Sequence, residues 1–176
     1  MRAPLACLAA IAGADYVIKR HRPPWLLIGP FDHTAHLATA GLVLLNLPPR
    51  SPEWSAAFLG GSLLPDVDHV PLALRPVHPS ADDPRPVRHC LLAVAPVAAA
   101  AAARRSEPLA ATAAGMLAHF ARDLGVGSGV PLLWPLTRYS VRLPYPAYAA
   151  ACLALAVRAA LRPERDQSDT AQAGAE

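Results

Sequence analysis

Charged and aromatic residues are scarce in this chain of 176 residues, of which 16% are charged and 6% aromatic. The arginines lie at the ends of apolar segments and form no basic stripe interleaved with aromatic side chains, so nucleic-acid binding is not predicted. Cysteine is rare too. Cys7, Cys90 and Cys152 lie far apart in apolar runs, which indicates buried thiols rather than a disulfide framework or a cysteine-based zinc site. Any bound metal must therefore be held by histidine and carboxylate.

Long hydrophobic runs and sustained β-type alternation are lacking, although 53% of the residues are hydrophobic. Alanine-rich apolar segments, each shorter than the roughly 20 residues that span a hydrocarbon core, alternate with proline- and arginine-bearing connectors. They are residues 4–18, 35–47, 54–64, 90–103, 109–121 and 147–161. We expect an all-α fold of five to six short Ala-rich helices packed as a bundle, in one domain over residues 1–162. The polar stretch 163–176 predicts a disordered tail.

The first residues, MRAPLACLAAIAGADY, allow two interpretations. A short apolar stretch ending in Ala-Gly-Ala loosely fits a secretory signal peptide. A first membrane helix running into the basic KRHR, Lys19 to Arg22, fits at least as well, and we favour it. The chain is therefore predicted to be a multi-pass protein of the cell membrane with lipids as partners. A soluble or secreted helical protein is the alternative that the short segments leave open.

Histidine and aspartate gather at four segment ends. FDHTAHLATAGLVL places His33 and His36 three residues apart, and GSLLPDVDHVPL places Asp66 and His69 at the same spacing. On a helix such pairs share a face. RPVRHCLLAV has a histidine at the start of an apolar segment, and GMLAHFARDLGVGSG has His119 and Asp123 one helical turn apart, with a helix end expected at Gly125.

Each of these residues also has a simpler interpretation. His89 could be a capping or hydrogen-bonded residue, and Asp66 or Asp32 could be a helix cap or turn residue. The set is stronger than its members, because imidazole and carboxylate pairs at one-turn spacing on several helices can meet at one divalent cation inside a bundle, with zinc the best match. A cation would also offset the cost of burying these groups among apolar residues.

The stretches AHLATAGLVL, GSLLPDVDHVPL, RPVRHCLLAV and GMLAHFARDLGVGSGVPLLWP, in this order, resemble the YdjM-like family of membrane-bound, metal-dependent hydrolases. That family combines an early histidine, a Gly-x-x-x-Pro-Asp-x-Asp-His block, an Arg-containing block ending Thr-His-Ser, and a His-x-x-x-Asp block followed by Gly and Trp-Pro. The resemblance covers roughly residues 32–135. The Asp-x-x-His and His-x-x-x-Asp elements are also similar to those of zinc-dependent phospholipases C and related zinc nucleases, which are all-helical and cleave phosphodiesters.

The resemblance implies a role for eight residues. The implied metal ligands are His36, Asp66, His69, His89, His119 and Asp123. Asp68 and Arg85 are implied to orient a ligand, act as a base or face the substrate. The third block departs from the family, because Arg88-His89-Cys90 replaces its Thr-His-Ser end, and His33 has no place in the pattern.

Two hypotheses follow. In the first, the chain is a membrane-bound metal-dependent hydrolase that acts on a phosphoester or lipid-derived substrate, or another small molecule, through metal-activated water. In the second, it is a non-catalytic integral membrane protein whose histidines and aspartates form a structural metal or hydrogen-bond network between close-packed helices. An open coordination position on the metal would favour the first hypothesis, because structural metal sites are closed.

Overall fold

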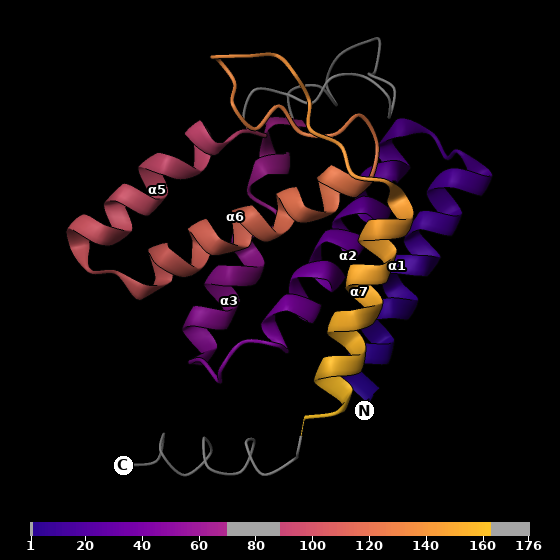
Figure 1. The fold of residues 1–176 in the computed structure, drawn as a ribbon, viewed down its shortest axis with the longest axis horizontal. Helices are drawn as coiled ribbons and strands as arrows, with labels where there is room; N and C mark the ends of the chain where they lie inside the picture. Colours follow the sequence, from indigo (N-terminus) through magenta and orange to yellow (C-terminus); the bar gives the residue numbers. More distant parts are fainter. Residues whose placement is uncertain (1, 70–88, 163–176) are drawn as a thin grey trace.

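The computed structural model describes residues 2–69 and 89–162, and the regular structure within them is helical (Figure 1). These residues form α1 (Arg2–His21), α2 (Trp25–Leu44), α3 (Pro52–Gly61), the short 3₁₀ helix η1 (Pro65–His69), α5 (Leu91–Arg104), α6 (Glu107–Gly125) and α7 (Tyr145–Ala160). In the same residues, strand-like pairing is limited to one isolated antiparallel bridge between Val130 and Val141. The predicted all-α fold is confirmed, while the tail at 163–176 lies outside the described residues.

Several helix boundaries follow local signals in the sequence. The hydroxyl oxygen of Ser51 accepts a hydrogen bond from the Trp54 backbone N–H at 3.1 Å, and Ser106 caps α6 in the same way through Leu109. Each serine is followed within two residues by a proline, which suits the first turn of a helix because its missing N–H would have no intrahelical partner. Helix α6 ends at Gly125, as predicted.

Helix α2 begins well before the apolar segment that predicts it. It starts at Trp25, with Pro24 as its N-cap, and continues through Pro30. Proline inside a helix removes one backbone hydrogen bond, so sequence patterns treat it as a stop, but here packing of α2 along α1 outweighs that loss. Asp32 therefore lies inside the helix, and its interpretation as an N-cap is wrong.

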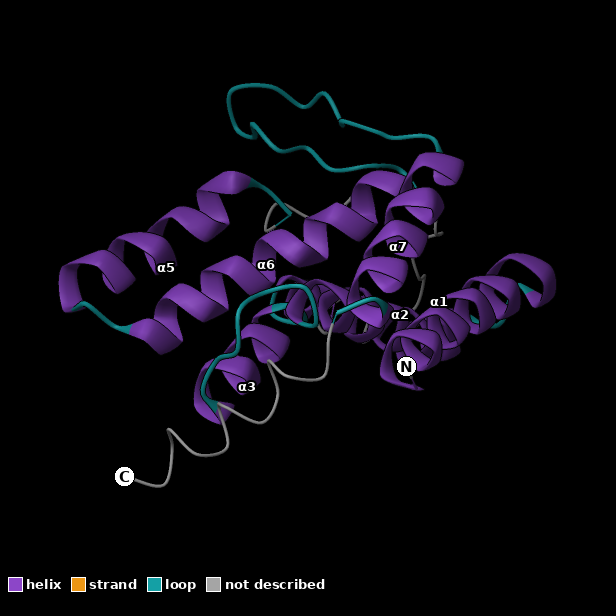
Figure 2. Cartoon of the chain, turned by 60° about the horizontal axis from the view of Figure 1, so that its bottom comes forward, coloured by secondary structure: helices purple, strands orange, loops and turns teal. Residues whose placement is uncertain are grey.

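Helix α6 is the central element of the arrangement. It packs against α2, α3, α5 and α7, while α1 and α2 pair with each other and α7 lies against both. Figures 1 and 2 show the long connection 126–144 between α6 and α7 lying beyond the helices as an irregular loop. None of the described helices combines the length and the apolar character needed to cross a bilayer.

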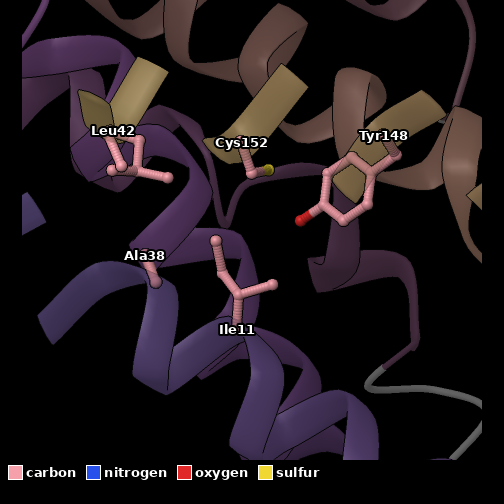
Figure 3. Close-up of a cluster of buried hydrophobic side chains, with 6 residues drawn as sticks. Ile11, Ala38, Leu42, Tyr148 and Cys152 are labelled. Atoms are coloured by element: carbon pink, nitrogen blue, oxygen red, sulfur yellow. The ribbon is translucent and has the colours of Figure 1, made fainter. Parts of the chain in front are cut away.

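The apolar core is divided into three small clusters rather than one. Figure 3 shows the cluster between α1, α2 and α7, where Ile11, Leu42 and Tyr148 meet Cys152. A second cluster, around Met116 and Phe120, joins α5 to α6, and a third, around Phe58, joins α2, α3 and α6. Cys90 and Cys152 are buried, as expected, whereas Cys7 is only partly buried, and none of the three cysteines forms a disulfide.

Helices α3 and α6 approach so closely that their backbones touch. A Cβ atom at Gly115 would overlap the carbonyl oxygen of Phe58, and a Cβ atom at Gly61 would overlap that of Thr112. The two glycines thus permit the contact, and any larger side chain must push the helices apart. By contrast, Gly60 in the same helix α3 faces open space.

We expect Gly115→Ala to destabilise the chain by about 1–3 kcal/mol or more, because the added methyl group overpacks a backbone contact. Gly60→Ala is the matched control, and it should leave stability unchanged or raise it slightly, because alanine favours helix where space is free. Thermal unfolding of the purified chain, followed by circular dichroism, measures both. Equal melting temperatures for the two variants would contradict the proposed contact.

Candidate metal centre

The candidate site lies where four segments meet. Helix α2 supplies Asp32, His33 and His36; η1 supplies Asp66 and His69; His89 immediately precedes α5; and α6 supplies His119 and Asp123. The six predicted ligands are therefore brought together by the fold. The side chain of Asp68 and the whole of Arg85 lie outside what the structure describes, so their roles stay predictions.

Helical spacing explains how each segment presents its pair. On α6, Nε2 of His119 lies 3.0 Å from Oδ2 of Asp123 four residues later. On the 3₁₀ helix, residues three apart are eclipsed, and Nδ1 of His69 lies 3.2 Å from Oδ1 of Asp66. The prediction that the two residues of each pair lie on the same face of their helix is confirmed.

Four donor atoms gather between η1, the segment before α5, and α6. Nε2 of His89 lies 3.3 Å from both Oδ1 of Asp66 and Nε2 of His119. The Asp66 oxygen is 3.5 Å from His119 Nε2, and Oδ2 of Asp123 is 3.0 Å from His119 and 3.6 Å from His89. We call these four atoms the first donor set.

The remaining oxygens of the two carboxylates face His36. Its Nε2 lies 3.4 Å from Oδ1 of Asp123, 3.6 Å from Oδ2 of Asp32 and 4.0 Å from Oδ2 of Asp66. The imidazole is stacked on that of His119, with ring centroids 3.7 Å apart and planes 5° from parallel. We call these four atoms, which include the His36 nitrogen, the second donor set.

The tautomer of His119 suits a metal ligand. Its Nδ1 lies 2.8 Å from the backbone carbonyl oxygen of Ser62. Because a carbonyl can only accept, Nδ1 carries the proton and the Nε2 lone pair faces the first donor set. Metal-binding histidines usually donate their other ring N–H to a carbonyl or carboxylate in this way.

Several groups of these residues could hold a cation. His36, His119 and Asp123 form one such group, Asp66, His89 and His119 a second, and Asp32, His36 and Asp66 a third. Among the described residues, neither ring nitrogen of the buried His36 has a hydrogen-bond partner. Buried polar atoms without partners are costly. The residues therefore fit a metal ion.

The electrostatics of the site favour positive charge near His36. Burial opposes protonation of His36, yet Asp32 and Asp123 raise its pKa to about 9. Burial is likewise outweighed at Asp66, where hydrogen bonds from His33, His69 and His89 hold the carboxyl pKa far below its usual range. Burial and the neighbouring His36 together lower the pKa of His119, which stays neutral. Ionised carboxylates beside a neutral imidazole are the donors that divalent cations require.

A buried arginine holds Asp32 and links the site to the neighbouring helices. Arg122 on α6 is fully buried, and its guanidinium donates to Asp15 at 2.9 Å and to Oδ1 of Asp32 at 2.9 Å. It also donates to the hydroxyl of Tyr148 at 3.3 Å, and the Tyr145 hydroxyl donates to the other oxygen of Asp15 at 2.7 Å. Helices α1, α2 and α7 are thereby joined to α6 by one charged network.

Sequence reasoning missed part of this arrangement. Asp32 and His33 stand four and three residues before His36 and so share its helix face, but they were not among the predicted ligands, because Asp32 could be a cap and His33 has no family position. Asp15 lies far away in an apolar segment, and no local pattern marks its pairing. The sequence did offer one signal for this network. It is Arg122 itself, an arginine inside an apolar helix directly before Asp123.

The chain matches the family described as YdjM inner membrane protein over residues 28–173. The match spans most of the chain and includes every donor of the candidate site. No curated protein and no solved structure matches the chain.

Replacing Arg122 by methionine should cost about 3–5 kcal/mol of unfolding free energy, because two carboxylates lose their buried counter-charge. Arg104→Met, at the exposed end of α5, is the matched control and should change little. Adding Asp15→Asn to Arg122→Met should recover part of the loss, because one uncompensated carboxylate is removed. Denaturant unfolding measures all three, and equal stabilities of the two arginine variants would contradict the network.

Proposed function

Because this chain belongs to the YdjM inner membrane protein family, which places it at a membrane, we propose that it is a membrane-bound, metal-dependent hydrolase. The observation that carries the proposal is the asymmetric exposure of the site. The side chains of His36, His89, His119 and Asp123 are 0–1% exposed, whereas those of Asp32, His33 and His69 are 22%, 46% and 28% exposed. Buried donors suit firm metal binding, and the solvent-facing side suits an incoming water and substrate.

The predicted ligands are the residues that would hold the cation. His89, His119, Asp66 and Asp123 offer four donors, with His36 and His69 adjacent to them. A bound zinc-like cation would polarise a phosphoryl or carbonyl oxygen and favour ionisation of water near neutral pH. We propose zinc because imidazole and carboxylate are ligands it accepts readily.

The residues on the solvent-exposed side of the site have complementary proposed roles. His33 is the exposed imidazole of the site, and its Nε2 lies 3.3 Å from Oδ2 of Asp66. That carboxylate raises the pKa of His33, so the imidazolium can give a proton to a leaving oxygen as the ester bond breaks. Asp68, one residue before His69, is proposed to take the proton of the attacking water, and Arg85 to face the substrate.

Phosphoesters and lipid-derived esters are the substrates that this arrangement suits. A cation and an imidazolium together neutralise the charge that develops on a phosphoryl group during cleavage. Leu64 and Val67, on either side of Asp66 in the chain, are exposed, so apolar surface adjoins the polar opening. This combination supports a substrate with a charged head and an apolar tail.

One observation favours the alternative of a structural site. The near-complete burial of His36, His89, His119 and Asp123 is also what a closed metal centre or hydrogen-bond network between helices requires. In that case the site joins α2, η1, α5 and α6 and performs no chemistry. Hydrolysis of phosphomonoester, phosphodiester or carboxylic ester substrates, lost in His119→Ala, separates the two functions.

Membrane lipids are the proposed partners. Leu153 and Val157 of α7 and Leu161 just after it are exposed along a shallow, largely apolar groove that also contains Arg158 and Arg162. Exposed apolar surface beside basic side chains suits lipid chains and anionic headgroups. The multi-pass arrangement stays a prediction.

The purified chain should contain a divalent metal in stoichiometric amount, and chelation should lower its melting temperature, because metal binds the folded state alone. His119→Ala should lose the metal. His21→Ala, an exposed histidine at the end of α1, should keep it. Inductively coupled plasma mass spectrometry measures the content, and a wild-type chain without metal would overturn the proposed function.

In cells, the chain should sediment with membranes and resist extraction by alkaline carbonate. Leu153→Glu combined with Val157→Glu should increase the soluble fraction, because two charges then face the lipid. Glu53→Gln, at an exposed position in the first turn of α3, serves as the control with unchanged partition. Release of the wild-type chain by carbonate without detergent would show that it is not embedded in the membrane.

A further inference from the structure

The carboxylates of Asp66 and Asp123 each point one oxygen into the first donor set and the other into the second. From this division we propose that the site holds two divalent cations, bridged by Asp66 and Asp123, with Asp32 as a ligand of the second. The inference rests on the proposed metal-dependent function and adds to it the number of ions and a ligand outside the predicted set.

The first donor set has the dimensions of a tetrahedral site. Two donors that each lie 2.0–2.1 Å from a tetrahedral zinc ion are about 3.3–3.4 Å apart. The imidazole nitrogens of His89 and His119 lie 3.3 Å apart, and each lies 3.0–3.6 Å from one oxygen of Asp66 and one oxygen of Asp123. These five separations suit one cation, which would use one oxygen from each carboxylate.

A single cation there would leave the second donor set unsatisfied. Nε2 of His36 is buried and has no hydrogen-bond partner among the described residues. It lies 4.0 Å from Oδ2 of Asp66 and 3.6 Å from Oδ2 of Asp32. A second cation supplies the missing partner to this nitrogen and uses the second oxygen of Asp66, which His33 approaches from the exposed side at 3.3 Å.

The charges in the site also favour a second cation. Asp32, Asp66 and Asp123 bring three carboxylates into one small region, where burial makes uncompensated charge costly. The guanidinium that pairs with Asp32 is shared with a fourth carboxylate, Asp15. One divalent cation leaves one of the three carboxylate charges to be balanced by a proton on an imidazole, whereas a second cation in the second donor set takes the place of that proton.

Arg122 positions Asp32 for this task. Its Nε and Nη2 donate to Oδ1 of Asp32 at 3.3 and 2.9 Å, which fixes the carboxylate and leaves Oδ2 facing His36. Arg122 is held in turn by Asp15 and Tyr148. It is a positioning residue that acts on the second cation through Asp32.

The test counts metal ions per chain after saturation with Zn²⁺ or Mn²⁺ and removal of excess ion. We expect two for the wild type, two for the control Glu53→Gln, and one for Asp32→Asn and for Arg122→Lys, whose ammonium lacks the guanidinium fork. One ion in the wild type would overturn the second cation and leave the proposed function standing, and none would overturn both. Two ions in a folded Asp32→Asn would overturn the role of Asp32.

A spectroscopic measurement keeps the proposal testable if the variants fail to fold. Metal ions in carboxylate-bridged pairs lie about 3.5–4 Å apart, so wild-type chain loaded with Mn²⁺ should give the electron paramagnetic resonance spectrum of an exchange-coupled pair. Sub-stoichiometric Mn²⁺ should give the six-line spectrum of an isolated ion. A six-line spectrum at saturation would overturn the bridged pair.

Discussion

Burial of charge in an alanine-rich bundle is the constraint on which the rest of this structure depends. One turn of α6 carries His119, Arg122 and Asp123 into the interior, and none of the three is exposed to solvent. The arginine is directed toward α1, α2 and α7, whereas the histidine and aspartate are directed toward η1 and the segment before α5. Each direction requires opposite charge or donors from other helices, so the polar groups determine which helices meet at α6.

The apolar core alone would not fix this arrangement. Its three clusters are small, and alanine contributes many of their members. Alanine offers little shape for interlocking, so many packings of such helices have similar free energies. Polar networks are more selective because a wrong register leaves a buried charge without its partner. In this fold, apolar burial drives collapse, and the charged residues of α6 select the register.

Much of the fold was predictable because it depends on local patterns. Segment composition indicated the helices, serine before proline marked two of their starts, and Gly125 marked an end. The candidate ligand pairs were predictable because one-turn spacing puts His119 beside Asp123 and Asp66 beside His69. The start of α2 was not predictable, because tolerance of Pro30 depends on tertiary packing. The pairing of Asp15 was not predictable either, because its partner lies more than a hundred residues away in the sequence.

The glycine contact between α3 and α6 also bears on chemistry. Gly61 immediately precedes Ser62, whose carbonyl oxygen accepts from Nδ1 of His119. The distance between the two helices thus sets the length of that hydrogen bond, and the hydrogen bond decides which nitrogen of the imidazole carries the proton. The two glycines therefore influence which nitrogen of a candidate ligand is protonated, and the spacing between two helix backbones becomes a property of the candidate metal centre.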